Sequence, residues 1–244
     1  MTTNQIDLTL VCGARPQLLL RTLDSFSDKV FQNFAVGQVI VNIDQVFGGA
    51  EQAEDCCSII LKRFPNAQIF RPQTASFGAA VKRLWMATDT RHVLHLEDDW
   101  EILHEVGPED LTPLSAPDVG MLQLAIETRE KYGDEFLYIT KRKRILGFEI
   151  YSRRVNAYGT SPRFIKSGLC KRYGELLKPN FDPEKQVYKN KNKKLSTAHE
   201  AWKCRILYGP NGGKLINDLG RDWRTVRKIK KVDYRGKSKW VSDE

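Results

Sequence analysis

Strand-like and helix-like segments alternate along the first hundred residues, and this order restricts the fold more than any other feature of the chain. Short apolar runs are followed each time by segments in which Leu, Ile or Ala recur at helical spacing. The expected strands are 6–13, 35–44, 67–71 and 92–98, and the expected helices are 15–26, 49–64 and 76–88, the last capped by Ser76. This order predicts an α/β fold with a mostly parallel central sheet and helices on both faces.

The pattern is more mixed after residue 100. Residues 118–128 and 136–166 predict strands and turns, 167–177 a helix, and 178–202 a turn at Asp182-Pro183 followed by a loop rich in Lys and Asn. No internal repeat or Gly/Ser-rich linker interrupts the 244 residues. We therefore expect a single domain over 1–244, with two functional halves, 1–102 and 103–244.

The composition is that of a globular protein, with 41% hydrophobic and 28% charged residues. No apolar run approaches the roughly 18 residues of a membrane span, and the first residues lack the basic stretch and cleavage site of a secretory signal. The five cysteines form no C-x-x-C pair, so neither a disulfide framework nor a zinc site is indicated. These features predict a cytoplasmic protein without an integral membrane segment.

Charge is distributed unevenly along the chain. Residues 1–140 carry 11 Lys+Arg and 20 Asp+Glu, a balance of −9, whereas residues 141–244 carry 28 and 10, a balance of +18. Three basic clusters lie in the second half, at 141–144, 189–194 and 219–240, and the last has Trp223, Tyr234 and Trp240 among its cations. Cations contact phosphates and aromatic rings stack on bases, so this half is expected to meet a polyanion. A solvated basic face and a segment lying on a membrane surface are the alternatives.

Three adjacent carboxylates, Glu97, Asp98 and Asp99, follow the fourth expected strand. Like charges side by side repel one another, so a positive partner is expected among them. In parallel sheets ligands bind beyond the carboxyl ends of the strands, and Mg²⁺ or Mn²⁺ commonly bridges such carboxylates to substrate phosphates. The alternative is a helix N-terminus that carries acidic residues.

The order of these segments resembles the GT-A fold of nucleotide-sugar-dependent glycosyltransferases. The matching pieces are "ARPQLLLRTLDSF" after the first strand, Asp44 after the second, "SFGAAVKRLW", and "LEDDW" after the fourth. The last is similar to the Asp-x-Asp element of that superfamily, in the Glu-Asp-Asp form of inverting members. The resemblance covers about residues 5–102, the nucleotide-sugar-binding half, and leaves 103–244 as the acceptor-binding half. The chain contains neither a GxGxxG nor a GxxxxGK[ST] motif.

The resemblance implies roles for individual residues in binding a nucleoside-diphosphate sugar, with UDP-sugar as the expected donor. Asp99 is the expected Mg²⁺ or Mn²⁺ ligand, and a late histidine, His199, is expected to complete the metal shell. Nucleotide binding is expected at Ala14 and Arg15 beside the base, Asp44 on the base edge, Lys82 and Arg83 at the diphosphate, and Asp98 near the ribose. Lys82 and Arg83 have the alternative of a solvated helix face, and His199 that of an ordinary surface histidine.

The acceptor hydroxyl must lose a proton when it attacks the sugar. The resemblance implies that a carboxylate at the head of a late helix takes this proton, and Glu184 in "FDPEKQV" is the candidate. Glu200 and Asp182 are the rivals. His92 and His95 are interpreted as strand residues with satisfied ring nitrogens.

These features predict a metal-dependent, inverting glycosyltransferase. A basic protein without a membrane anchor is similar to phage enzymes that glycosylate DNA, so the expected acceptor is a 5-hydroxymethylpyrimidine in DNA, and a phage enzyme would act in the host cytoplasm. The expected DNA contacts are Arg227, Lys228, Lys230 and Lys231. A transferase for a bacterial surface polysaccharide or lipid-linked glycan is the first alternative. A nucleic-acid-binding module without catalytic activity is the second.

Overall fold

The central element of the computed structural model is a seven-stranded sheet, and the residues described are 4–88, 91–146, 148–189, 191–234 and 237–242. The strand order is β10-β6-β9-β4-β1-β2-β3. Their bounds are β1 Gln5–Cys12, β2 Ala35–Ile43, β3 Gln68–Phe70, β4 His92–Glu97, β6 Val119–Leu124, β9 Arg163–Ile165 and β10 Lys203–Leu207. Only β9 runs antiparallel to its neighbours in this sheet. The predicted mostly parallel sheet is confirmed.

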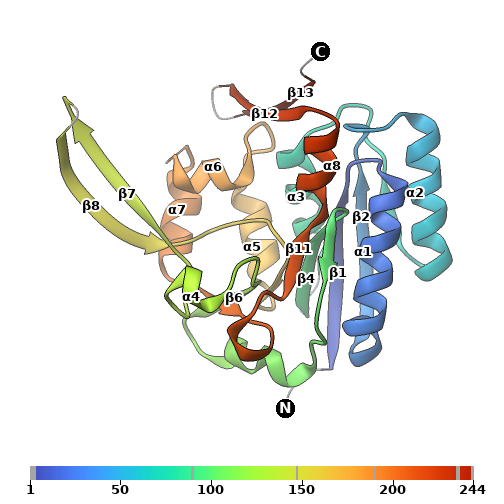
Figure 1. The fold of residues 1–244 in the computed structure, drawn as a ribbon, viewed down its shortest axis with the longest axis horizontal. Coiled ribbons are helices and arrows are strands. Elements are labelled where there is room, and N and C mark those ends of the chain that lie inside the picture. The colour runs from blue at the N-terminus through green and yellow to red at the C-terminus, as the bar shows by residue number, and fades with distance from the viewer. Residues whose placement is uncertain (1–3, 89–90, 147, 190, 235–236, 243–244) are drawn as a thin grey trace.

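Helices cover both faces of the sheet, as predicted (Figure 1). One face packs against α1 (Pro16–Lys29), α2 (Ala50–Arg63) and the 3₁₀ segment η2 (Pro108–Ser115), and the other against α3 (Phe77–Met86), α5 (Leu169–Leu176), α6 (Pro183–Tyr188) and α7 (Lys193–Glu200). Each helix offers one apolar side, such as Leu19, Leu23 and Phe26 of α1. Burial of these two layers of apolar side chains supplies the main driving force for the fold.

The loop predicted over 178–202 is wrong in part, because helices α6 and α7 lie within it. The Asp182 side chain caps α6 by accepting from the backbone N–H groups of Glu184 and Lys185. Asn192 caps α7 by accepting from Leu195 N at 3.2 Å. Lys and Asn were interpreted as loop formers, whereas Asn at an N-cap starts a helix. Ser76 is confirmed as the cap of α3.

Three small antiparallel sheets complete the chain. Strand β5 (Trp100–Ile102) pairs with β11 (Ile216–Asp218), and this pairing brings α8 (Leu219–Val226) back to the acidic triplet. Strands β12 (Ile229–Tyr234) and β13 (Lys237–Ser242) pair next to the carboxyl end of the main sheet. Strands β7 (Tyr138–Ile145) and β8 (Phe148–Asn156) pair with each other and project from the body (Figure 1). The short helix α4 (Arg129–Tyr132) precedes β7, and no described helix is both long and apolar enough to cross a membrane.

His95 is a fully buried residue of β4, as interpreted, but only one of its ring nitrogens is satisfied, because Nε2 has no hydrogen-bond partner among the described residues. Its Nδ1 lies 2.8 Å from Thr9 Oγ1 and accepts a hydrogen bond from Trp85 Nε1 at 3.2 Å. Burial, assisted by the charge of Arg163, lowers the pKa of His95 to about 3. The folded protein therefore holds this ring neutral across the pH range in which an unfolded chain protonates it.

We expect acid to destabilise the protein through His95. Because the folded pKa is depressed, the unfolded state binds the extra proton between about pH 6.5 and pH 3, and the free energy of unfolding falls by up to about 1.4 kcal/mol per pH unit there. Urea unfolding of His95→Gln from pH 7 to pH 4 should show a shallower decline than the wild type. Thr225→Ala, a substitution at an exposed position that removes no titratable group, should keep the wild-type slope. Equal slopes for all three proteins would contradict the assignment.

Candidate active site

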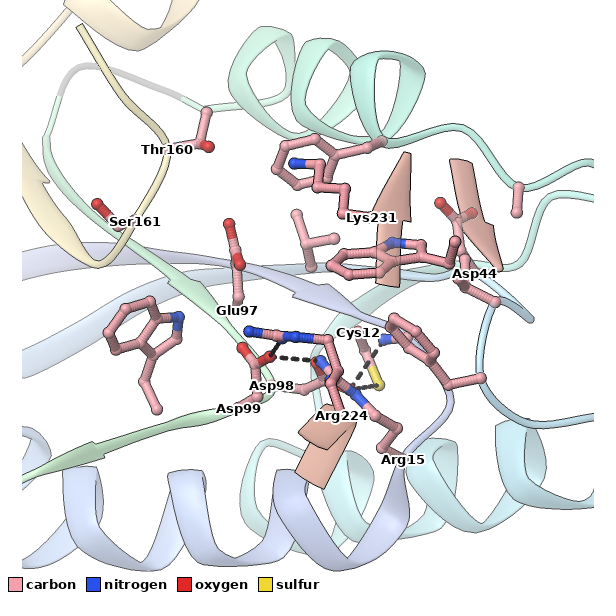
Figure 2. A pocket seen from close by; sticks show the side chains of 18 of the residues that line it. Cys12, Arg15, Asp44, Glu97, Asp98, Asp99, Thr160, Ser161, Arg224 and Lys231 are labelled. Carbon is pink, nitrogen blue, oxygen red and sulfur yellow. Dashed lines mark hydrogen bonds and ion pairs between the residues drawn. The ribbon is translucent and has the colours of Figure 1, made fainter. Parts of the chain in front are cut away.

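A pocket of about 490 Å³ lies beyond the carboxyl ends of β1, β2 and β4. Its size is typical of small-molecule sites. The charged residues that line it are Arg15, Asp44, Glu97, Asp98, Asp99, Glu184, Arg224 and Lys231. They come from both halves of the sequence, and Figure 2 shows the acidic triplet at their centre. The position agrees with the expectation that polar residues following parallel strands meet at one edge of the sheet.

Two arginines supply the positive partner that the acidic triplet was expected to have. Arg15 Nη2 lies 2.5 Å from Asp98 Oδ1 and 3.0 Å from Asp99 Oδ2. Arg224 Nη1, from α8, lies 3.1 Å from the same Asp99 oxygen. Burial lowers the pKa of Arg15, but the attraction of Asp98 and Asp99 outweighs it, so the net shift is upward. Arg15 therefore joins the two aspartates, and Arg224 adds a second contact to Asp99.

Asp98 connects the acidic triplet to the first loop of the fold. Its Oδ2 accepts from the backbone N–H of Gly13 at 2.8 Å, and Arg15 donates to both carboxylate oxygens. Both residues follow β1. The Asp98 carboxylate thus fixes the turn between β1 and α1 at the pocket wall, and its expected place near the ribose stays a prediction.

The two carboxylate oxygens of Asp99, the expected metal ligand, have different surroundings. Its Oδ1 is buried and has no hydrogen-bond partner among the described residues, whereas Oδ2 carries both arginines. Burial raises the pKa of Asp99, and the two arginines oppose this shift. No group of three or more His, Cys, Asp or Glu side chains in the described ranges forms a complete metal site. A cation at Asp99 would therefore take further oxygen ligands from water and substrate, as Mg²⁺ usually does.

Glu97 is a pocket residue whose importance the sequence did not reveal. It extends toward the side of the pocket where Thr160 and Ser161 lie (Figure 2). Burial raises its pKa well above the usual value, and the nearby charges of Asp99 and Glu184 raise it further. Glu97 therefore holds its proton more tightly than an ordinary glutamate and can donate a hydrogen bond to a bound substrate.

Glu184 lines the pocket from the first turn of α6. Its Oε1 accepts from the backbone N–H of Thr160 at 3.0 Å and lies 3.3 Å from Thr160 Oγ1. Asp182 and Glu200 are not among the lining residues: Asp182 caps α6 and forms an ion pair with Lys231, and Glu200 is exposed on α7. The geometry favours Glu184 among the three candidate bases. No sequence pattern predicted that Thr160 would contact Glu184.

Asp44, the residue expected on the edge of the base, lines the pocket and is held by two hydrogen bonds. Its Oδ1 accepts from Asn42 Nδ2 at 2.9 Å and its Oδ2 from Ser76 N at 3.2 Å. Burial raises the pKa of this carboxyl group. Ala14 is buried, has a positive φ of 58° and is not a lining residue, but its neighbours Gly13 and Arg15 are. The backbone bend at Ala14 therefore serves to aim Arg15 at the carboxylates.

Lys82 and Arg83 lie on α3 but are not among the residues that line the pocket. Lys82 Nζ donates to the carbonyl oxygens of Gly174 at 2.7 Å and Leu177 at 2.9 Å, at the end of α5. Arg83 donates to Asn42 Oδ1 and lies 5.5 Å from the ring centre of Phe70. Arg83 supports the pocket wall from behind, because Asn42 in turn holds Asp44, whereas Lys82 ties α3 to the end of α5. Lys82 therefore matches neither expectation: it does not line the pocket where a diphosphate would bind, and it does not lie on a solvated helix face.

His199 lies in an aromatic cluster rather than in the pocket lining. Its Nδ1 is 2.9 Å from Tyr173 Oη, and its ring is 5.4 Å from that of Tyr158. The residue is buried, so it is not an ordinary surface histidine either. Asp99 lines the pocket and His199 does not, so the structure does not bring the two expected metal ligands to one site.

The C-terminal basic segment lies over the pocket. Lys231 and Trp240 are lining residues, and Trp240 lies 5.4 Å from Phe47, measured between ring centres. Arg227 stacks on Trp223 at 4.2 Å and is exposed, as are Lys228 and Lys230. Of the four expected DNA contacts, Lys231 therefore faces the pocket and three lie outside it. The side chain of Tyr234 is outside the described part of the structure.

Gly220 allows α8 to approach Asp99. The backbone N–H of Gly220 and that of Leu219 donate to the Asp99 carbonyl oxygen at 3.2 and 2.9 Å. A Cβ at position 220 would lie 1.8 Å from Asp99 Oδ2 and 2.6 Å from Arg224 Nη1. The glycine is thus required by close packing against the acidic triplet.

We expect Gly220→Ala to destabilise the protein by about 1–3 kcal/mol, the usual cost of overpacking. In an open helix the same change would stabilise by roughly 1 kcal/mol, so the sign distinguishes the two situations. Thr225→Ala, on the exposed side of the same helix, serves as the control in urea unfolding. A stabilised Gly220→Ala protein would show that α8 does not pack on Asp99.

Comparisons with known proteins identify the fold but no family. No protein-family model matches the chain, and neither does any curated protein. A mannosyltransferase from Pyrobaculum calidifontis, in complex with GDP-Man and Mn²⁺, is 10% identical, with a TM-score of 0.53 over 84% of this chain and 55% of that one. GalNAc-T7, with UDP, GalNAc and Mn²⁺, is 9% identical, with a TM-score of 0.54 over 87% and 43%. HddC from Yersinia pseudotuberculosis is 12% identical, with a TM-score of 0.51 over 90% and 97%.

These similarities confirm the predicted GT-A-like α/β fold class. Identities of 9–12% demonstrate a shared fold and nothing further. The chain spans about half the length of the two sugar-transferase structures that it matches.

Proposed function

We propose that this chain transfers a sugar from a nucleoside-diphosphate sugar to a hydroxyl acceptor. The observation that carries the proposal is the arrangement of Asp44, Asp99 and Glu184 around one pocket at the carboxyl edge of the sheet. Asp44 is suited to accept hydrogen bonds from the nucleobase, Asp99 to bind a cation, and Glu184 to take a proton from the acceptor. The GT-A-like fold and the glycosyltransferases that share it support the same reading.

The charge balance of the pocket supports a cation. Five carboxyl groups line it, of which Glu97 holds its proton tightly, against three basic side chains, and all three of these already pair with Asp98, Asp99 or Asp182. A diphosphate is itself an anion, so it requires added positive charge to bind here. The buried, unpartnered Asp99 Oδ1 fits such an ion. Mg²⁺ or Mn²⁺ held by Asp99 would supply Lewis-acid neutralisation of the leaving diphosphate.

The remaining residues orient the donor. Asp44 accepts hydrogen bonds from the edge of the base, and its own fixed contacts to Asn42 and Ser76 set the direction of its lone pairs. Phe47 and Trp240 form an aromatic wall against which a flat ring can stack. Lys231 lines the pocket beside Trp240, with its Nζ 5.7 Å from the centre of that ring and 3.4 Å from Asp182 Oδ2, and adds positive charge to this wall.

Glu184 acts as the general base in this proposal. The acceptor oxygen attacks the anomeric carbon, the bond from that carbon to the diphosphate oxygen breaks, and Glu184 takes the hydroxyl proton, with inversion at the carbon. The Thr160 contacts hold one carboxylate oxygen and so limit rotation of the group. Orientation of this kind is what makes general base catalysis effective.

The test is a panel of sugar nucleotides incubated with the protein and Mn²⁺, with release of the nucleoside diphosphate as the readout. A transferase should hydrolyse one donor slowly in water and lose this activity in excess chelator. A matched assay supplies nucleoside triphosphate and sugar phosphate and measures pyrophosphate. Pyrophosphate release without donor hydrolysis would instead identify a nucleotidyltransferase.

The acceptor is proposed to be a hydroxyl on a molecule that presents negative charge. The exposed Arg227, Lys228 and Lys230 next to the pocket support this class. DNA with 5-hydroxymethylpyrimidines and a lipid-linked or surface glycan are its two candidates.

If the acceptor is DNA, we expect affinity for a short duplex to fall steeply with salt. The log–log slope should be about −0.9 per phosphate contacted. Replacing Arg227, Lys228 and Lys230 by Gln should flatten this slope without changing donor hydrolysis, since none of the three lines the pocket. Fluorescence anisotropy across a salt series measures the slope. Weak, salt-insensitive binding together with no sugar transfer to hydroxymethylated DNA would exclude DNA as the acceptor. The glycan would then be the remaining candidate.

A further inference from the structure

The β7–β8 hairpin is built differently from the rest of the molecule. Its strands pair with each other and with no other described strand, and the ribbon extends away from the body (Figure 1). Its base is attached through Asn156 Nδ2, which donates to the carbonyl of Glu200 in α7 at 3.4 Å. An isolated two-stranded hairpin is only marginally stable in water, so an extended one indicates a surface that another partner covers.

Large apolar side chains gather at the tip of this hairpin. The exposed fractions are 93% for Leu146, 76% for Phe148, 55% for Ile150 and 52% for Tyr151. All four lie within six consecutive positions. Apolar groups concentrated in one exposed patch mark a site of interaction rather than an accident of the surface.

Basic residues flank this tip along both strands. The sequence of β7 carries Lys141, Arg142, Lys143 and Arg144, and β8 carries Arg153 and Arg154. Among those whose side chains are described, Arg142, Arg153 and Arg154 are all exposed. Arg154 also forms an ion pair with Asp134 at 2.9 Å. The hairpin therefore combines an apolar end with a cationic stem.

We propose that the tip of β7–β8 inserts into the surface of an anionic lipid membrane. Arg142 precedes Leu146 by four residues, a distance of roughly 13 Å along an extended strand. The interfacial layer of a bilayer is about 5–8 Å thick on each side, so the tip reaches the acyl boundary while the basic stem lies at the headgroups. Apolar insertion combined with basic contacts to anionic lipids is the general mode of interfacial binding.

A membrane accounts for both parts of the hairpin, whereas duplex DNA accounts for the cations alone. The phosphate backbone offers no apolar surface to Leu146 and Phe148. The strand β8 leads within four residues to Thr160, which lines the pocket. A hairpin fixed in a membrane would thus hold the pocket near molecules anchored there. The inference does not depend on the chemistry proposed for the pocket.

The test is co-sedimentation of the whole protein with vesicles. Vesicles of phosphatidylglycerol and phosphatidylcholine are compared with vesicles of phosphatidylcholine alone. We expect at least tenfold tighter binding to the anionic vesicles. Leu146→Ser combined with Phe148→Ser should reduce this binding at least tenfold. Arg142→Gln combined with Arg153→Gln should reduce it and weaken its dependence on salt.

Val226→Ser is the matched control, because Val226 is 79% exposed but lies on α8, away from the hairpin. It should bind vesicles as the wild type does. Equal binding to neutral and anionic vesicles, or full binding by the Leu146/Phe148 variant, would overturn the proposal. The proposal would also be overturned if the wild type bound short duplex DNA but no vesicles, and the Leu146/Phe148 variant no longer bound that DNA. Donor hydrolysis should be unchanged in every variant, so failure of the pocket chemistry would be recognised separately.

Discussion

Replacing Asp99 by asparagine is expected to lower sugar-donor turnover by about 10³-fold. The cation that Asp99 is proposed to hold contributes several kcal/mol of charge stabilisation, and each 1.4 kcal/mol corresponds to about a factor of ten in rate. The substitution keeps the shape of the side chain but removes its charge. It also leaves one side-chain oxygen where Asp99 offers two, Oδ2 to both arginines and Oδ1 to the proposed cation. Nucleotide binding should lose its dependence on Mn²⁺.

Calorimetric titration of nucleoside diphosphate, with Mn²⁺ and with chelator, measures this effect directly. Asp118→Asn is the control, because Asp118 is a half-exposed carboxylate that pairs with Lys203 and does not line the pocket. Thermal melting should show that both variants fold. Full turnover by Asp99→Asn, or undiminished wild-type activity in excess chelator, would remove the cation from the proposal.

Glu184→Gln is expected to reduce transfer by about 10²–10⁴-fold, the range for loss of a general base. Glutamine retains an acceptor oxygen for Thr160, so the loop at the pocket wall should keep its position. Only the ability to take a proton is lost. Donor affinity should therefore change little, and the effect should fall on kcat rather than on binding.

Glu200→Gln provides the control, since Glu200 is exposed on α7 and does not line the pocket. Single-turnover rates separate the chemical step from product release. An unaffected rate in Glu184→Gln would move the search to Glu97, the other glutamate of the pocket, and not to Asp182, whose carboxylate caps α6.

The first half of the fold could be predicted because its signals are local. The strands β1, β2 and β4 are apolar runs, the helices between them have one apolar side, and Pro16 and Ser76 stand at helix starts. Parallel neighbours then place the ends of β1 and β4 together, so Asp98 and Arg15 had to lie close to one another. The sequence therefore predicted that the triplet would have a positive partner, although not which residue it would be.

The remaining features depend on contacts between distant segments, which no local pattern encodes. Strand β9 is three residues long and enters the sheet antiparallel between β4 and β6. Arg224 reaches Asp99 only because β11 pairs with β5. The roles expected for Lys82 and His199 followed from a family resemblance, but packing against α5 and Tyr173 decided where these side chains lie. Charge counting alone could not separate Lys231, in the pocket, from Lys228, outside it.

The return of α8 to Asp99 also sets an order of events during biosynthesis. A ribosome delivers β1, α1 and the acidic triplet long before it delivers Arg224 and Trp240, and N-terminal parts of a chain generally fold first. Until α8 emerges, Asp98 and Asp99 have Arg15 as their only recorded basic partner in the described structure. The nascent protein would thus carry a finished sheet with an open, strongly acidic rim. The protein can therefore bind an anionic donor only at the end of synthesis, when the C-terminal α8 folds onto the acidic triplet that follows β4.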